Sequence, residues 1–565
     1  MNNNKLKLII LCSMFGVMLL LGVLSFGDFK FSPKEGLSYE DKKRDAKYLI
    51  EFLENTYPYF EEVKKETGQD ILSNKTKIIN SISKTPSDEA FYESISNLLL
   101  KFSYGNTQLS YNLDSLGNSF TYMDKDINYK KTTSLATIEK WKPINENYWK
   151  KIISPTNINF LYINGEYYVS ATQNPEVHVG DKLIKAEGIP IDKYVEKMPS
   201  HKFLKAYDPT YEKYVSHYNL TSIKNKESNI KVTLLNASNE EKVVDMLPFD
   251  DKKPFLEDGF SSLRNSNSYN EIVDEKELEK IKLVNSFEDG KLVTLNLSAY
   301  VDINKNYRNN KKNKEDLFSL INSSDTLVLD FRGGTDLDFS IEILDYILPK
   351  DIEHYNYKVF RKGKVNDKYI ETLRNKSNPF IKEITAPIDS LEKAYPLSKY
   401  YIFKEQILKI NGENKYNGKV FALHDGSVYS DKITELLSEV TENSLATVIS
   451  NVKLYSRDLN YDSMISFTLP NSNLTIQTSS VKRVDINGDF IGNKVVMPQV
   501  LITKDIKPIL DDLKNGKGVN WGLAFKDRYG SKDEYFNEVL KQLVKTTRKT
   551  GGLHQPYKGM VLAVS

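Results

Sequence analysis

The chain has 565 residues, a length that predicts roughly two to four domains. Its composition, 40% hydrophobic and 27% charged, is typical of a globular protein that buries sizeable cores. The 78 basic and 76 acidic residues nearly balance, which argues against a polyanionic partner such as a nucleic acid.

Cysteine and histidine usage restricts the sites that the chain can build. The single cysteine, Cys12, lies in an apolar N-terminal segment, so the remaining chain can form neither a disulfide nor a thiolate metal site. The six histidines are scattered and lack the paired spacing of zinc ligands. We therefore expect no metal ion and no other cofactor.

The N-terminal segment is strongly apolar. The run Leu8–Phe26 follows Lys5 and Lys7, is long enough to cross a bilayer, and its flanking lysines favour a cytoplasmic N-terminus. A cleaved signal peptide is the alternative, because small residues in Ser25–Gly27 suit a cleavage site. Residues 1–27 are thus predicted to be a membrane anchor or signal segment. The bulk of the chain would lie outside the cytoplasm, either held at the cell membrane or secreted.

Residues 36–130 are predicted to form a helical N-terminal domain. Two apolar stripes have the spacing of amphipathic helices, and they consist of Ala46, Leu49, Ile50 and Leu53, and of Phe91, Ile95, Leu98 and Leu99. A strand is expected at Gln108–Asn112, after the second helix.

Residues 150–250 are predicted to form a small β-rich module. Ile158–Ser170 alternates like a hairpin with Asn164-Gly165 as its turn. Val179–Ile191 predicts a strand, a turn and a second strand, followed by a helix near Tyr194–Lys197. Two further strands, Ile230–Leu235 and Lys242–Leu247, would close the module.

Residues 280–515 are predicted to form an α/β core. Strands alternate with helices in this range, which favours a buried and largely parallel sheet. The expected strands are Leu292–Tyr300, Thr326–Asp330, Val420–Leu423 and Ala446–Ile449, with Ile465–Leu469, Leu474–Thr478 and Val495–Ile502 completing the core. A C-terminal helix at Tyr535–Val544 and a basic tail are expected within residues 530–565.

Two stretches of this core lie where strands of the predicted sheet end. They are Asp330–Gly334 and His424–Asp431. Functional groups of such sheets gather at the carboxyl ends of strands, so the two stretches could face one another. Ser430 lies at a strand–turn–helix junction, where the first amides of the helix could stabilise an oxyanion. The alternative is that Ser430 only caps the helix, although a capping box would need Glu or Gln where Ile433 stands.

Taken together, these segments resemble the S41 serine peptidases, the group of the C-terminal processing peptidases and the tricorn core. The resemblance extends over residues 40–512 and rests on four stretches in the family's order, Leu98–Thr107, Val179–Ile191, Leu327–Gly334 and Val420–Asp431. It implies a PDZ-like module within residues 150–250 and a ClpP/crotonase-like α/β peptidase core. It also implies that Ser430 is the nucleophile, with the amides of Asp431 and of Gly333 or Gly334 at the oxyanion-hole positions.

The general base departs from the family pattern. The family's histidine falls on Asn106, whose amide cannot accept a proton near neutral pH. The lysine of the processing peptidases has no exact counterpart, because Lys453 lies two positions early. His424, six residues before Ser430, is the other candidate base. A serine hydroxyl is a weak nucleophile without such a base.

These observations favour an extracytoplasmic, membrane-anchored S41-type serine peptidase that hydrolyses peptides or proteins through Ser430. A catalytically impaired pseudopeptidase that binds peptides or proteins is the alternative, favoured by the missing family groups. A surface protein in which the sheet is only a scaffold is the third hypothesis.

Overall fold

The computed structural model describes residues 36–102, 104, 107–110, 120–121, 135–152, 156–198, 205–216, 229–250, 252–258, 283–297, 307, 310–333, 337–375, 381–425, 431–455, 464–516, 528–529 and 533–549. The expected anchor or signal segment at residues 1–27 lies outside this set and stays a prediction. Within the described residues, no helix combines the length and the apolar character needed to cross a membrane.

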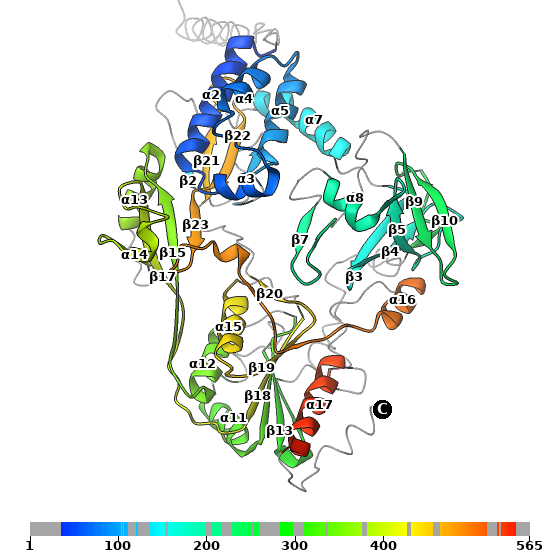
Figure 1. Ribbon diagram of the computed structural model, residues 1–565, viewed down its shortest axis with the longest axis vertical. Coiled ribbons are helices and arrows are strands. Elements are labelled where there is room, and N and C mark those ends of the chain that lie inside the picture. Colours follow the sequence, from blue (N-terminus) through cyan, green and yellow to red (C-terminus); the bar gives the residue numbers. More distant parts are fainter. Residues whose placement is uncertain are drawn as a thin grey trace, which may run out of the picture.

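The elements gather into groups that Figure 1 shows as separate lobes. N-terminal helices form one lobe, the β-rich module a second, and the α/β core a third. A pair of long strands runs along one side and joins the core to the helical lobe.

The N-terminal lobe confirms the predicted helices and their buried faces. Its helices are α2 (Tyr39–Thr56), α3 (Phe60–Thr67), α4 (Lys75–Ser83), α5 (Asp88–Leu99) and α7 (Leu135–Ile152). All eight residues of the two predicted stripes are buried in one core. Serine side chains fix two helix starts, because Ser38 caps α2 in a capping box with Asp41 and Ser87 caps α5.

Two strands that we expected in the α/β core belong instead to this lobe. β21 (Met464–Thr468) and β22 (Thr475–Ser479) pair with the short strands β1 (Gln108–Ser110) and β2 (Phe120–Thr121). Phe467 of β21 stacks on Phe52 of α2, with ring centroids 3.6 Å apart. The expectation was wrong because an apolar run predicts a buried strand without specifying its sheet.

A carboxylate of α2 also holds the turn between β21 and β22. Asp45 accepts hydrogen bonds from the backbone amides of Asn471, at 2.9 Å, and Ser472, at 2.8 Å. The indole of Trp141 in α7 donates to the carbonyl of Ser472, at 2.9 Å. Residues more than 400 positions apart in the sequence thus complete one hydrophobic core.

The β-rich module confirms the predicted hairpin and strand pairs. Its sheet has the order β10-β9-β5-β4-β11, with β3 on β4 and β6 on β5. The elements are β3 (Ile158–Ile163), β4 (Glu166–Thr172), β5 (Lys182–Ala186), β6 (Ile189–Pro190), α8 (Ile191–Lys197), β7 (Ala206–Asp208), β8 (Lys213–Val215), β9 (Ile230–Leu235), β10 (Glu241–Met246) and β11 (Glu257–Asp258). Asn164 and Gly165 both have positive φ, 49° and 84°, as the tight hairpin turn requires.

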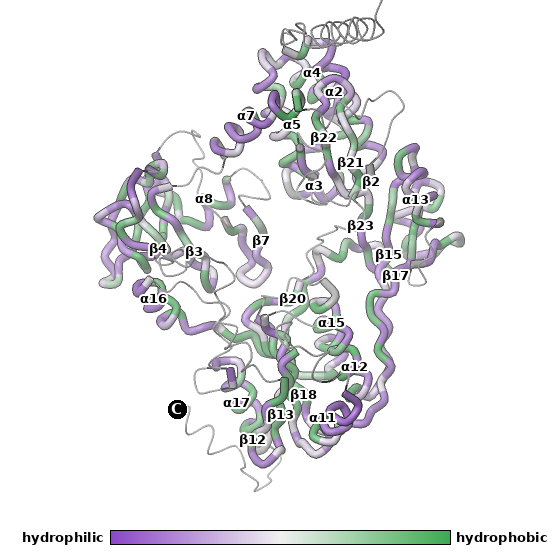
Figure 2. The backbone as a smooth tube through the Cα atoms, turned by 180° about the vertical axis from the view of Figure 1, so that it is seen from behind, coloured by the Kyte–Doolittle hydropathy of each residue, from purple (hydrophilic) through white to green (hydrophobic). Residues whose placement is uncertain are grey.

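The core is a mostly parallel sheet, as predicted, with the order β12-β13-β14-β18-β19-β25. β12 pairs antiparallel with β13, and the remaining neighbours are parallel. The strands are β12 (Val284–Phe287), β13 (Leu292–Asn296), β14 (Thr326–Asp330), β18 (Lys419–His424), β19 (Thr447–Ser450) and β25 (Val500–Leu501). Figure 2 shows β13 and β18 mainly in the colour of hydrophobic residues.

Helices cover both faces of this sheet. Leu327 and Leu329 of β14 pack in a core with α11 (Lys311–Ser323), α12 (Leu337–Ile347) and α15 (Asp431–Glu442). Val328, between them, points to the opposite face and packs against α17 (Glu534–Lys549). Burial on both faces explains why β14 is a continuous apolar run.

A second sheet, which we did not predict, joins the core to the helical lobe. It has the order β16-β17-β15-β23. Its elements and their flanking helices are β15 (Ile352–Arg361), α13 (Lys364–Asn375), β16 (Ile381–Glu383), α14 (Asp389–Glu392), β17 (Tyr400–Ile410) and β23 (Val481–Val484). One end of the β15–β17 pair contributes Ile352 and Leu408 to the α/β core, and the other contributes Phe360 and Phe403 to the helical core.

The module docks on helix α16 (Ile506–Lys514), which follows β25. Leu513 is buried in a small apolar core with Ile163, Tyr168 and Val179 of the module. The short pair β20 (Leu454–Tyr455) and β24 (Val495–Val496) lies beside α15. The C-terminal helix predicted at 535–544 is confirmed as part of α17.

We expect Leu513→Ala to weaken this docking, because it removes buried methyl groups and leaves a cavity. The loss should be about 2–5 kcal/mol of unfolding free energy. Urea unfolding measures it, with Lys507→Ala on the exposed side of α16 as the matched control. Equal stabilities of the two variants would contradict the assignment of α16 as the support of the module.

Candidate functional site

The carboxyl ends of the parallel strands lie side by side at one edge of the core sheet. Asp330, the last residue of β14, is in register with Leu423 of β18. His424, the last residue of β18, is in register with Ser450 of β19. The turn after β14 and the chain after β18 therefore leave the sheet at the same edge.

The turn after β14 contains Gly333, one of the residues expected at the oxyanion hole. Phe331 extends the pairing by one residue, because its amide donates to the carbonyl of Leu423 at 2.9 Å. Gly333 then adopts a left-handed conformation with φ 78°, which favours glycine over residues with a side chain. Gly334 lies outside the described residues.

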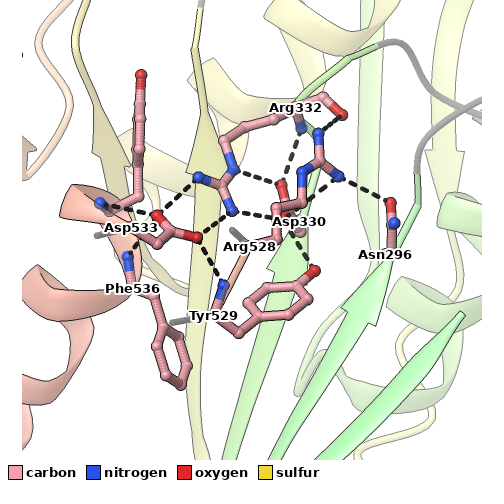
Figure 3. A network of polar contacts seen from close by, with 8 residues as sticks. Asn296, Asp330, Arg332, Arg528, Tyr529, Asp533 and Phe536 are labelled. Atoms are coloured by element: carbon pink, nitrogen blue, oxygen red, sulfur yellow. Dashed lines mark hydrogen bonds and ion pairs between the residues drawn. The ribbon is translucent and has the colours of Figure 1, made fainter. Parts of the chain in front are cut away.

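Arg332 is buried between two carboxylates (Figure 3). Its Nε and Nη2 donate to the two oxygens of Asp330, at 2.9 and 2.8 Å. Its Nη1 and Nη2 donate to the two oxygens of Asp533, both at 2.9 Å. Asp533 also caps α17 by accepting from the amides of Tyr535 and Phe536, at 3.1 Å. This pairing ties the turn after β14 to the start of α17.

A second arginine, Arg528, completes this network. Its Nη1 donates to Asn296 Oδ1, at the end of β13, at 3.1 Å, and its Nη2 donates to the carbonyl oxygen of Arg332 at 3.0 Å. The hydroxyl of Tyr529 donates to Asp330 Oδ2 at 2.8 Å. The network therefore joins two strand ends, the turn and the C-terminal segment (Figure 3).

The opposite charges of the network offset the cost of burying each charged group. Burial alone raises the pKa of Asp330, but the nearby guanidinium groups of Arg332 and Arg528 outweigh it and lower that pKa to about 2. The Asp330 and Asp533 carboxylates in turn keep the pKa of Arg332 well above its ordinary value, against the opposing effect of burial. Asp330 and Arg332 are thus charged at neutral pH.

His424, one candidate base, is 3% exposed at the end of β18. Its Nδ1 lies 3.2 Å from the hydroxyl of Ser450, and its Nε2 has no hydrogen-bond partner among the described residues. Burial lowers the pKa of His424 to about 4, although the charge of Asp425 acts in the opposite direction. The imidazole is therefore neutral near pH 7.

Lys453, the other candidate base, lies in the loop after β19 and contacts the β-rich module. Its Nζ donates to Glu212 Oε1 at 2.7 Å, and its backbone amide donates to Thr210 Oγ1 at 3.1 Å. Both partners lie between β7 and β8 of the module. In this arrangement the ammonium group of Lys453 is engaged in an ion pair.

Three of the proposed site residues, Ser430, Asn106 and Gly334, lie outside the described residues, so their roles stay predictions. Asp431 is the first residue of α15, the predicted helix after the junction. Two contacts hold α15 against β15. His354 pairs with Glu439 at 2.8 Å, and Asn356 Nδ2 donates to Glu435 Oε1 at 2.9 Å. The backbone amide of Asp431 thus belongs to a helix that is anchored on the second sheet.

Lys504, which the sequence patterns did not single out, also lies at this edge. Its ammonium group lies 5.9 Å from the ring centroid of Tyr535, and its carbonyl accepts from Asn164 Nδ2 at 2.8 Å. Burial lowers the pKa of Lys504, and the charges of Asp425 and Glu534 oppose this effect. No motif identifies Lys504, because it reaches the edge through the fold and not through its spacing from Ser430.

Within the described part of the chain, no three His, Cys, Asp or Glu residues are arranged to hold a metal ion. Arg332, Arg528 and Asp533 form a buried polar cluster with Asp330 at this edge. Sequence patterns missed Arg528 and Asp533 because each lies about 200 residues from its partner in the turn after β14.

Comparisons with known proteins give structural similarities only. No protein-family model and no curated protein matches the chain. The structure is similar to mature CPAF, with a TM-score of 0.44 and 11% identity over 91% of this chain and 99% of that one. It is also similar to the photosystem II D1 C-terminal processing protease, with a TM-score of 0.32 and 11% identity over 85% and 99%. A Bacteroides fragilis chain named "Putative S41 protease" gives a TM-score of 0.20 and 10% identity over 70% of this chain and 83% of that one.

We expect Asp330→Asn to lower stability at pH 7, because it leaves the buried Arg332 and Arg528 without one counter-charge. The depressed pKa of Asp330 contributes stability above the unfolded value of about 4 that is lost as the pH falls toward 2. The unfolding free energy of the wild type should therefore exceed that of Asp330→Asn by about 2–3 kcal/mol near neutrality, and this difference should narrow below pH 4. Urea midpoints between pH 2 and 7 test this, and a gap that stays constant would contradict it.

Proposed function

We propose that the chain is an extracytoplasmic serine peptidase of the S41 type that hydrolyses peptide bonds with Ser430 as nucleophile. One observation carries the proposal. The Gly333 turn follows β14, and the junction that ends at Asp431 follows the neighbouring strand β18. The two expected oxyanion donors thus belong to segments that follow neighbouring strands of the sheet. The motif order of the sequence supports the same reading.

In this mechanism the Ser430 hydroxyl attacks the carbonyl carbon of the scissile peptide bond. The amides of Asp431 and Gly333 donate hydrogen bonds to the oxyanion that forms. The leaving amine takes the proton that the base removed from Ser430, and water then hydrolyses the acyl-enzyme by the reverse proton route.

We assign the base to His424 in preference to Lys453. A base must accept a proton, and the buried His424 is neutral near pH 7, with no hydrogen-bond partner at Nε2 among the described residues. The Lys453 ammonium instead forms an ion pair with Glu212. A low pKa makes His424 a weak base, so we expect a modest rate.

The substrate would be an extended peptide or a protein segment. The β-rich module resembles a PDZ-like domain, which captures peptides by adding a strand to its sheet. The N-terminal segment would hold the enzyme at the membrane, or release it if cleaved, so that substrates are met outside the cytoplasm.

A second candidate is a pseudopeptidase that binds peptides without cleaving them. The ion pair between Lys453 and Glu212 favours it, because it engages the lysine side chain that would otherwise be a candidate base. Asn106 at the position of the family histidine favours it as well.

We expect the folded chain without its N-terminal apolar segment, from Lys30 onward, to react covalently with a fluorophosphonate probe at Ser430. Ser430→Ala should abolish the labelling, as judged by fluorescence after denaturing electrophoresis and by mass spectrometry of the labelled peptide. Absence of labelling in the folded wild type would support the peptide-binding candidate. Labelling that persists in Ser430→Ala would refute the nucleophile assignment.

We expect the labelling rate to depend on pH through His424. With a pKa of about 4 the base stays deprotonated above pH 5, so the rate should be flat near neutrality and fall as the pH drops through 4. His424→Gln should lower the rate at pH 7 by about 10²-fold or more. If Lys453→Met instead lowered the labelling rate this much, and His424→Gln kept the wild-type rate, the base would be the lysine.

A further inference from the structure

The contact between Arg528 and the turn after β14 reaches the backbone of the proposed oxyanion hole. Arg528 Nη2 donates to the carbonyl oxygen of Arg332 at 3.0 Å. That carbonyl belongs to the peptide unit that links Arg332 to Gly333. The N–H group at the other side of this unit is the Gly333 amide, one of the two proposed oxyanion donors.

A peptide unit is planar, and its C=O and N–H bonds point in opposite directions in the trans form. A hydrogen bond that fixes the direction of the Arg332 carbonyl therefore fixes the direction of the Gly333 N–H. A cationic donor on the carbonyl also polarises the unit, which makes the N–H a stronger donor.

The contact matters at this position because Gly333, which has no Cβ, restricts its own backbone torsions little. Its φ of 78° lies in a region that glycine enters about as readily as the opposite sign of φ. A rotation of the Arg332–Gly333 peptide unit is therefore inexpensive for this residue. It would turn the carbonyl, in place of the N–H, toward a developing oxyanion.

Arg528 is itself held in place. Its side chain is 4% exposed and lies 3.6 Å from Asp330 in an ion pair. Its Nη1 donates to Asn296 at the end of β13. The guanidinium is thus fixed against two strands of the sheet, and the Arg332 carbonyl is fixed against the guanidinium.

We infer that Arg528 is a positioning residue, which orients the Gly333 N–H toward the oxyanion by holding the Arg332 carbonyl. The catalytic part of this inference rests on the proposed peptidase function, whereas the orienting contact does not. Arg528 lies almost 200 residues from the turn, and no motif of the sequence assigns it a role.

The first experiment observes the peptide unit directly and needs no activity. The pair Arg-Gly occurs once in the sequence, at 332–333. Labelling arginine carbonyls with ¹³C and glycine amides with ¹⁵N therefore gives one peak in a carbonyl–amide correlation spectrum. We expect Arg528→Gln to shift this peak, with the carbonyl carbon moving to lower frequency as its hydrogen bond is lost.

Tyr529→Phe is the matched control, because it removes a neighbouring hydrogen bond to Asp330 and leaves both Arg528 contacts in place. It should leave the peak close to its wild-type position. If Arg528→Gln does not fold, Arg528→Lys keeps the charge beside Asp330 but cannot reach Asn296 and the carbonyl together. Arg528→Lys should give an intermediate shift.

The second experiment measures fluorophosphonate labelling as a maximal rate, kinact, and an apparent affinity, KI. Arg528→Gln should lower kinact by about 10²-fold with KI changed less than about threefold, as for loss of an oxyanion donor. Tyr529→Phe should keep both values within about threefold of wild type.

The outcomes separate the two proposals. An unshifted peak in Arg528→Gln overturns the positioning role, whatever the activity. A shifted peak in a chain whose wild type never labels supports the contact and refutes the peptidase proposal. A shifted peak with unchanged kinact, in a wild type that does label, overturns the catalytic part of the inference.

Discussion

The candidate site depends on the buried ion network of Asp330, Arg332, Arg528 and Asp533. Taking these charges out of water costs several kcal/mol for each ion, and only the mutual pairing of the groups offsets that cost. Removal of one member is consequently costly, because it leaves a buried charge without its partner. The network joins the ends of β13 and β14 to the C-terminal segment, so that helix α17 and the Gly333 turn hold each other in place.

The hydrophobic part of the core gives this network its rigid base. Leu327, Val328 and Leu329 alternate between two apolar layers, one with α11, α12 and α15 and the other with α17. A parallel sheet buried on both faces presents its strand ends at one edge. Polar groups concentrate there, and the β-rich module reaches the same edge through Asn164 on Lys504 and Glu212 on Lys453.

Sequence patterns predicted the parts of this architecture that depend on local chemistry. Asn164-Gly165 specifies a hairpin turn on its own, and β14 was located residue for residue because its apolar run ends at a charged residue. The β15–β17 pair escaped detection because its two ends serve different hydrophobic cores, so no single periodicity runs through either strand. Arg528, Asp533 and Lys504 escaped detection because contacts between distant segments leave no regular spacing in the sequence.

The placement of β21 and β22 has a consequence for biosynthesis. The helical lobe begins at residue 39, yet its core includes Phe467 and its α2 carboxylate binds the turn at residues 471–472. A ribosome adds about 5–20 residues per second, so the first helices are exposed for at least about 20 seconds before their partner strands are made. During that interval α2 can pack on α4, but Phe52 lacks its stacking partner Phe467 and the buried carboxylate of Asp45 lacks the amides that it binds in the folded chain.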